Sequence, residues 1–137
     1  MLFPKLMRYS RELKRLLHIH RSLVPQQKVK AVNRISYDEV WQKVLRLRPK
    51  KDGPKLIPCA FTDWDNTPRH RERGTVYDGV SPEKFHSYFA QLVENARRFY
   101  DTDMIFVFAW NEWSEGGYLE PDERNGMAFL EAIKSCL

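Results

Sequence analysis

Two apolar runs, each followed by a polar segment and then by a helix pattern, most limit what this chain can fold into. Residues 55–62 form the first run and residues 104–109 the second. A short continuous apolar run predicts a strand of a parallel sheet buried on both faces. Pro58 weakens the first prediction, because proline cannot donate a ladder hydrogen bond. The order strand, long loop, helix, repeated twice, predicts two βα units of an α/β fold.

Capping residues predict where the helices begin. Ser36 with Glu39 forms a capping box, and Ser81 stands before Pro82 at the first position of a second helix. Apolar residues then recur at helical spacing: Val40, Trp41, Val44 and Leu45 in the first helix, and Phe85, Phe89, Leu92, Val93 and Ala96 in the second, which runs to Tyr100. We also expect a basic amphipathic helix over 5–19, a loop over 49–54 and a last helix over 124–136.

The chain length bounds this fold. Its 137 residues suit one domain with a modest core, whereas a closed eight-stranded barrel needs about 250 residues. Two parallel strands do not make a stable sheet of this kind alone. We therefore expect the chain to be the C-terminal part of a larger α/β fold, preceded by basic helices.

Charge is unevenly divided along the chain. Residues 1–50 carry 13 Lys and Arg against 3 Asp and Glu, and residues 51–137 carry 10 against 15. A basic half can contact nucleic acid or an anionic membrane surface. The basic residues alternate with Leu and Val and form no polybasic block, so we favour a solvated helix and expect no nucleic-acid partner. A peripheral contact of residues 1–35 with an anionic membrane stays open.

Cysteine and histidine usage indicates neither a metal site nor an oxidising compartment. Cys59 and Cys136 lack metal-ligand spacing, and we expect buried free thiols in a cytoplasmic protein. His18 and His20 have no third ligand nearby. The N-terminal apolar runs are too short for a secretory signal or a membrane span. No phosphate-binding glycine loop or dinucleotide fingerprint is present, so we expect no cofactor.

Two polar clusters, Asp63–Arg69 and Trp110–Asp122, each begin where an apolar strand ends. Because ligands of α/β folds bind at the carboxyl ends of the strands, we expect the clusters to share one rim. Tryptophan faces stack on sugar rings, and Asn, Asp and Arg offer the hydrogen bonds that hydroxyls need. The candidate substrate-binding residues are Trp64, Asp65, Asn66, Arg69, Trp110, Asn111, Trp113 and Glu120.

Glu112 and Glu115 are the candidate catalytic residues. Cleavage of a glycosidic bond needs two carboxyl groups in different protonation states, and a helical turn would place residues three apart on one side. We expect Trp110 and Trp113 to desolvate them, and the glycines at 116 and 117 to let the backbone approach a ligand. The alternative is that the glutamates are solvated loop acids and the tryptophans fill the core. Capping explains Glu120 and Asp122 more simply than catalysis does.

Three motifs in order carry a family resemblance: Trp-Asp-Asn-Thr-Pro-Arg at 64–69, Ala-Trp-Asn-Glu-Trp-Ser-Glu-Gly at 109–116, and Tyr-Leu-Glu-Pro-Asp at 118–122. From Tyr37 to the C-terminus the chain resembles the WbsX-type glycosyltransferases, also described as glycoside hydrolase family 99-like proteins. The resemblance divides the chain into a basic helical segment, 1–35, and a barrel part, 36–137. Residues 1–35 resemble no family that we can name.

The resemblance implies the last portion of a (β/α)₈ TIM-type barrel and a role in bacterial cell-surface polysaccharide assembly, such as O-antigen (lipopolysaccharide) or capsule. It further implies a retaining mechanism, in which Glu112 deprotonates a sugar 2-hydroxyl and Glu115 is the general acid/base. Glycosyl transfer and hydrolysis both remain open. Because most of the barrel is missing, we expect little or no activity from the chain alone.

The resulting hypothesis is a carbohydrate-active enzyme fragment that acts on glycosidic bonds. The alternative is a catalytically inactive, truncated carbohydrate-binding remnant. A third hypothesis, a basic nucleic-acid-binding domain, predicts salt-sensitive affinity centred on residues 1–50.

Overall fold

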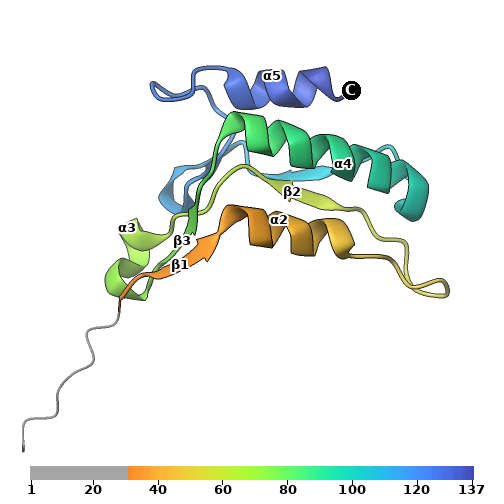
Figure 1. The fold of residues 1–137 in the computed structure, drawn as a ribbon, viewed down its shortest axis with the longest axis horizontal. Coiled ribbons are helices and arrows are strands. Elements are labelled where there is room, and N and C mark those ends of the chain that lie inside the picture. The colour runs from red at the N-terminus through yellow and green to blue at the C-terminus, as the bar shows by residue number, and fades with distance from the viewer. Residues whose placement is uncertain (1–30) are drawn as a thin grey trace, which may run out of the picture.

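The structure, a computed structural model, describes residues 31–137. These residues form a mixed α/β fold. The predicted helix over 5–19 and the two histidines within or beside it lie outside these residues. Helix α4 (Pro82–Tyr100) lies between α2 (Tyr37–Arg46) and α5 (Ala128–Ser135) and contacts both (Figure 1). The α/β class is confirmed.

A parallel pair of strands joined through α4 is the predicted βαβ unit. Strand β2 (Cys59–Phe61) pairs in parallel with β4 (Phe106–Phe108), with Ala60 opposite Val107. Strand β2 begins directly after Pro58, whose carbonyl still accepts a hydrogen bond from the Phe106 amide at 3.0 Å. Proline therefore shortens the predicted 55–62 strand at its start without preventing the pairing.

Both predicted helix starts are confirmed. The Ser36 hydroxyl accepts a hydrogen bond from the Glu39 amide at the start of α2, and the Ser81 hydroxyl accepts one from the Lys84 amide at the start of α4. Side-chain oxygens at these positions satisfy backbone donors that the first helical turn leaves free.

The core lies where α2 and α4 meet the β2–β4 pair. Trp41 is fully buried, and its ring stacks on Phe61 with centroids 4.8 Å apart and on Tyr88 at 5.6 Å. All five residues of the predicted α4 stripe, Phe85, Phe89, Leu92, Val93 and Ala96, are buried. Phe129 and Ala132 of α5 complete the same core from the other side of α4.

A second parallel pair of strands was not predicted. Strand β1 (Asn33–Ser36) pairs in parallel with β3 (Thr75–Asp78), and the Arg34 side chain donates to the Asp78 carboxylate, Nε to Oδ2 at 2.8 Å. Both strands are four residues long and partly polar, so neither has the apolar run that marks a buried strand in sequence.

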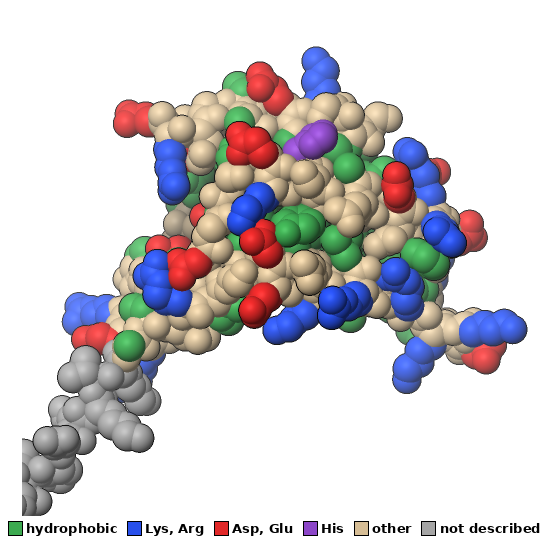
Figure 2. Space-filling model, viewed as in Figure 1, with side chains coloured by type: hydrophobic (Ala, Val, Ile, Leu, Met, Phe, Trp, Pro, Cys, Tyr) green, Lys and Arg blue, Asp and Glu red, His purple; other side chains and the backbone are tan. Residues whose placement is uncertain are grey.

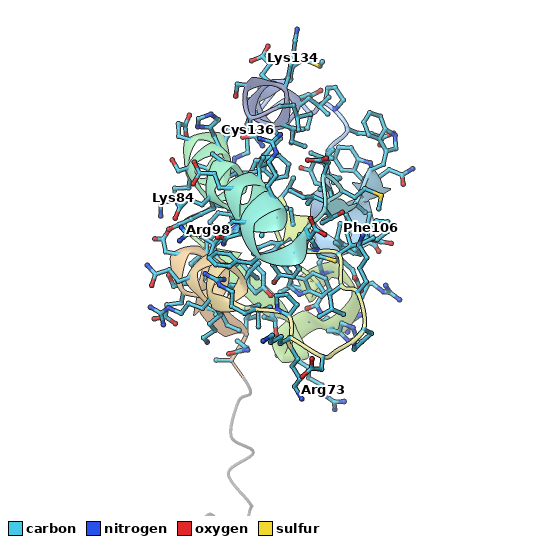
Figure 3. The ribbon with its side chains drawn as sticks, turned by 90° about the vertical axis from the view of Figure 1, so that its right-hand side faces the viewer. Arg73, Lys84, Arg98, Phe106, Lys134 and Cys136 are labelled. Carbon is cyan, nitrogen blue, oxygen red and sulfur yellow. The ribbon has the colours of Figure 1, made fainter. Side chains whose placement is uncertain are left out.

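The expectation that residues 104–109 are buried on both faces is wrong. Within this run Phe106 is 62% exposed and Phe108 38% exposed, and Figure 3 shows Phe106 at the surface. The alternate residues Ile105 and Val107 pack against the core, while Phe106 and Phe108 on the other face stay partly exposed. Cys59, paired with Phe106 on that face, is exposed as well, so the expectation of a buried thiol is also wrong there.

The remaining elements are short. Helix α3 (Thr67–His70) and a 3₁₀ turn (Arg71–Arg73) lie between β2 and β3, and strands β5 (Asn111–Glu112) and β6 (Gly117–Tyr118) pair antiparallel around a 3₁₀ turn (Trp113–Glu115). The predicted last helix begins later than expected, at Ala128.

Basic side chains gather over the end of α2 and the loop after it (Figure 2), where the exposed residues are Lys43, Arg46, Arg48, Lys50, Lys51 and Lys55. No helix within residues 31–137 is long and apolar enough to cross a membrane.

Candidate functional site

The two polar clusters lie against each other at the carboxyl ends of β2 and β4, which confirms the expected shared rim. The Asp65 amide donates to the Glu115 carbonyl at 2.8 Å. The Arg69 guanidinium, from α3, pairs with the Glu115 carboxylate, Nη1 to Oε1 at 3.0 Å. A backbone bond and an ion pair thus join segments that are 46 residues apart or more.

The two candidate catalytic glutamates stand at opposite ends of one 3₁₀ turn. Glu112 is the last residue of β5 and precedes the turn, and Glu115 is the last residue of the turn. The Ser114 hydroxyl donates to a Glu112 carboxylate oxygen, and Arg69 binds Glu115. Each carboxylate therefore has one neighbour that restricts its position.

The tryptophans of the second motif are at the surface. Trp110 is 54% exposed and Trp113 48% exposed. One face of Trp113 stacks on Tyr118 with centroids 3.7 Å apart, and its indole N–H donates to Glu120 Oε2 at 2.6 Å. That these rings desolvate the carboxylates stays a prediction, and their exposed aromatic faces suit stacking on a ligand.

Trp64 occupies a different position. It is half-buried beneath the rim, with its ring 5.7 Å from that of Phe108 and 6.4 Å from that of Tyr77. Its backbone carbonyl accepts a hydrogen bond from the Tyr77 amide at 2.9 Å. Trp64 thus fixes the first cluster to β3.

Several candidate sugar-binding groups already have partners within the protein. Asp65 Oδ1 accepts from the Thr67 amide and hydroxyl at 2.9 and 2.6 Å, and Asn66 Oδ1 accepts from the Thr75 amide at 2.7 Å. These bonds hold the loop between β2 and β3 in shape. Asn111, by contrast, is exposed, at the edge of the small hairpin opposite Tyr118.

Gly116 and Gly117 leave room for neighbouring segments of the site. At Gly116 φ is +69°, and a Cβ built there would lie 2.9 Å from the Asp65 amide nitrogen. At Gly117 a Cβ would lie 2.5 Å from the Phe108 ring. Gly116 therefore allows the two motif segments to pack on each other, and Gly117 allows the hairpin to pack on Phe108 of β4.

Sequence reasoning gives no role to three residues that face a small cavity beside this rim: Asp63, Tyr118 and Arg124. Burial raises the pKa of Asp63 above its usual range, although Asp63 Oδ1 accepts a hydrogen bond from the Trp64 amide. Burial and a hydrogen bond to Asp122 raise the pKa of Tyr118 to about 12. In the sequence, Asp63 could have been identified as the first charged residue after an apolar strand.

Replacing Asp63 with asparagine is expected to stabilise the chain near pH 7. Because burial raises the folded-state pKa, ionised Asp63 lowers stability, and this loss develops as pH rises from the unfolded value, about 4, through the raised folded value. The side-chain oxygen of the introduced asparagine would keep the acceptor for the Trp64 amide. Thermal midpoints between pH 4 and 7 should show D63N gaining a few degrees over wild type at pH 7 and converging with it toward pH 4.

Exposed Glu94 on α4 provides the control for that measurement, since E94Q removes a carboxylate without touching the rim. An equal gain in E94Q, or a D63N difference that does not change with pH, would contradict the assignment.

Across the described residues no group of three His, Cys, Asp or Glu side chains could hold a metal ion. His70 is exposed at the end of α3.

Comparison with known proteins assigns this arrangement to a family. Residues 3–133 match the family described as Glycosyltransferase WbsX, and the chain belongs to that family. The match begins well before Tyr37, so it includes most of the N-terminal segment for which the sequence suggested no relative.

The curated relatives are much longer proteins. In two strains of Xanthomonas campestris pv. campestris, B100 and ATCC 33913, the uncharacterized protein WxcX is 37% identical to this chain over 102 residues. That alignment covers 71% of this chain and 14% of each relative. No solved structure matches the chain significantly.

Proposed function

We propose that this chain carries part of the active site of an enzyme that makes or breaks glycosidic bonds, with Glu112 and Glu115 as its catalytic pair. The observation that carries the proposal is the contact between Arg69 and Glu115 at 3.0 Å. It brings the two family motifs together at the carboxyl ends of parallel strands, where α/β enzymes bind their substrates.

The roles of the two glutamates follow from the family resemblance. Glu112 would deprotonate the sugar 2-hydroxyl, and Glu115 would serve as general acid/base in a retaining mechanism. Arg69 and Ser114 support these roles by restricting the two carboxylates. The exposed faces of Trp110 and Trp113 would stack on sugar rings, with Trp64, Asp65, Asn66, Arg69, Asn111 and Glu120 shaping the rest of the binding surface.

The larger architecture is proposed to be a glycoside hydrolase family 99-like (β/α)₈ barrel, with residues 36–137 as its C-terminal part and residues 1–35 as a basic helical segment. The β2–α4–β4 unit supports this, since it is the repeating unit of such a barrel. Exposed Phe106 supports it as well, because further elements of a barrel would cover that face.

For the biological setting, we propose assembly of a bacterial cell-surface polysaccharide from the cytoplasmic side, with a sugar or oligosaccharide as the partner. We expect no nucleic-acid partner, and a peripheral membrane contact of residues 1–35 stays an option. A second candidate function is sugar binding without catalysis, for which the exposed faces of Trp110 and Trp113 would suffice.

The experiment compares wild type with the double variant E112Q/E115Q. Saturation-transfer NMR would measure binding of α-mannosides and of UDP- and GDP-sugars, and mass spectrometry would measure products. We expect both proteins to bind a sugar, and any turnover by wild type to fall by about 10²–10⁴-fold in the variant. E94Q, remote from the rim, should behave as wild type.

Sugar binding without turnover in either protein would favour the non-catalytic candidate. Equal turnover in both would exclude the glutamate pair. Absence of binding by wild type to every sugar tested would contradict the proposed function itself.

A further inference from the structure

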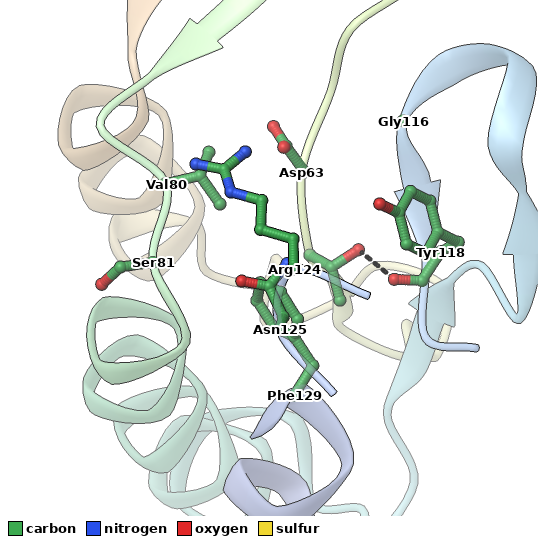
Figure 4. A pocket seen from close by; sticks show the side chains of 9 residues that line it. Asp63, Val80, Ser81, Gly116, Tyr118, Arg124, Asn125 and Phe129 are labelled. Atoms are coloured by element: carbon green, nitrogen blue, oxygen red, sulfur yellow. Dashed lines mark hydrogen bonds between the residues drawn. The ribbon is translucent and has the colours of Figure 1, made fainter. Parts of the chain in front are cut away.

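A small polar cavity adjoins the proposed catalytic rim. Its volume is about 30 Å³, which is room for one water molecule or one hydroxyl group. Figure 4 shows that its walls come from the end of β2, the start of α4, the segment around β6 and the loop before α5. The residues that line it are Thr62, Asp63, Val80, Ser81, Gly116, Tyr118, Arg124, Asn125 and Phe129.

The walls of this cavity are held by hydrogen bonds among themselves. Thr62 Oγ1 donates to the Tyr118 carbonyl at 3.0 Å (Figure 4). Asp122 accepts the Tyr118 hydroxyl at 2.9 Å and the Asn125 side-chain amide at 3.1 Å. The Tyr118 hydroxyl thus uses its one hydrogen on Asp122, and the Asn125 amide uses one of its two hydrogens there.

Two charged groups facing the cavity keep unused capacity. Asp63 uses Oδ1 to accept from the Trp64 amide at 2.6 Å. Within residues 31–137, neither Asp63 Oδ2 nor the Arg124 guanidinium has a hydrogen-bond or ion-pair partner. The side chains of Asp63 and Arg124 extend toward the same space (Figure 4).

A carboxylate and a guanidinium beside one small space select a neutral group that both donates and accepts. An anion would meet the Asp63 carboxylate and a cation would meet Arg124, whereas a hydroxyl can donate to the first and accept from the second. Hydrogen bonds to charged groups are stronger than neutral ones. The space is too small for a ring, so it suits a single hydroxyl or hydroxymethyl group.

The cavity is next to the candidate catalytic residue. Gly116 lines it, and the preceding residue, Glu115, is bound through its carbonyl to Asp65, two residues after Asp63. We propose that this cavity is a sugar subsite, in which Asp63 accepts a hydrogen bond from one substrate hydroxyl and Arg124 donates to the same oxygen. This inference rests on the proposed function, and it makes Asp63 and Arg124 specificity-determining residues.

The test measures how binding changes when a protein side chain, a sugar hydroxyl, or both are removed. Saturation-transfer NMR titrations would measure binding of methyl mannosides, glucosides and galactosides, together with the monodeoxy analogues of whichever binds best, to wild type, D63N, R124Q and E94Q. We expect one deoxy analogue to bind wild type about tenfold more weakly than the parent sugar. D63N and R124Q should weaken the parent by a similar factor and leave that analogue unchanged.

Circular dichroism and thermal midpoints would verify that the variants fold, and Arg124 is exposed, so R124Q carries little risk. If D63N and R124Q weaken every analogue equally, or change none, the subsite is overturned while the proposed function stands. If no sugar binds wild type, the proposed function fails and the subsite fails with it.

Discussion

Replacing Trp41 with alanine is expected to lower the free energy of unfolding by about 3–5 kcal/mol, the largest loss that we expect from any single substitution in this chain. Trp41 has no exposed surface. Its ring is stacked between Phe61 of β2 and Tyr88 of α4, and Phe85 packs on its edge at 6.0 Å. Alanine would therefore leave a cavity where α2, α4 and the sheet meet. Urea denaturation followed by circular dichroism measures the loss.

Two further substitutions separate packing from other effects. The Trp41 indole N–H is buried without a hydrogen-bond partner among the described residues, so W41F keeps an aromatic ring, removes an unsatisfied donor and should cost clearly less than W41A. W110A removes a tryptophan that is 54% exposed and should cost less than about 1 kcal/mol. Similar losses in W41A and W110A would show that the core is not where the structure places it.

This contrast shows what a sequence can and cannot say about tryptophans. The helical spacing of Trp41 with Val44 and Leu45 correctly predicts a core position, because the period of a helix fixes which residues share a face. Trp110 and Trp113 lie in a loop with no period. The position of the Trp113 ring depends on Tyr118 and Glu120, which contact it in the folded hairpin.

The same reasoning explains the fold predictions. Ser36 and Ser81 act on amides three residues away, so local sequence is enough to predict both helix starts. Strand β1 depends on β3, whose paired residues lie 42 positions further along the chain, and neither segment has an apolar run. A prediction from local pattern has no information about such a partner.

For the site, the general rule about carboxyl ends of strands predicts that the two clusters meet, and they do. Which side chains pair there depends on the local backbone path. Arg69 reaches Glu115 because α3 turns the chain directly after Asn66. The surroundings of Asp63 depend on Val80 and Phe129, which come from two other segments.

Replacing Gly116 with alanine is the second large effect that we expect, a loss of about 2–4 kcal/mol together with loss of sugar binding. A positive φ costs an alanine about 1–2 kcal/mol. The new Cβ would also lie 2.9 Å from the Asp65 amide nitrogen, and backbone on both sides leaves little room to move. The hydrogen bond from the Asp65 amide to the Glu115 carbonyl would then break.

Gly126 provides a matched control for G116A, because its φ is +55° and nothing lies within 4 Å of a Cβ built there. G126A should lose only the conformational part, about 1–2 kcal/mol, and should still bind sugar. Hydrogen exchange adds a local measurement, since the Asp65 amide should lose its protection in G116A and keep it in G126A. Equal losses of stability in the two variants, with Asp65 protected in both, would mean that the contact between the two motif clusters does not hold the rim together. The difference between two glycines that both have a positive φ thus isolates the backbone contact of Gly116 with Asp65, which joins the two motif clusters.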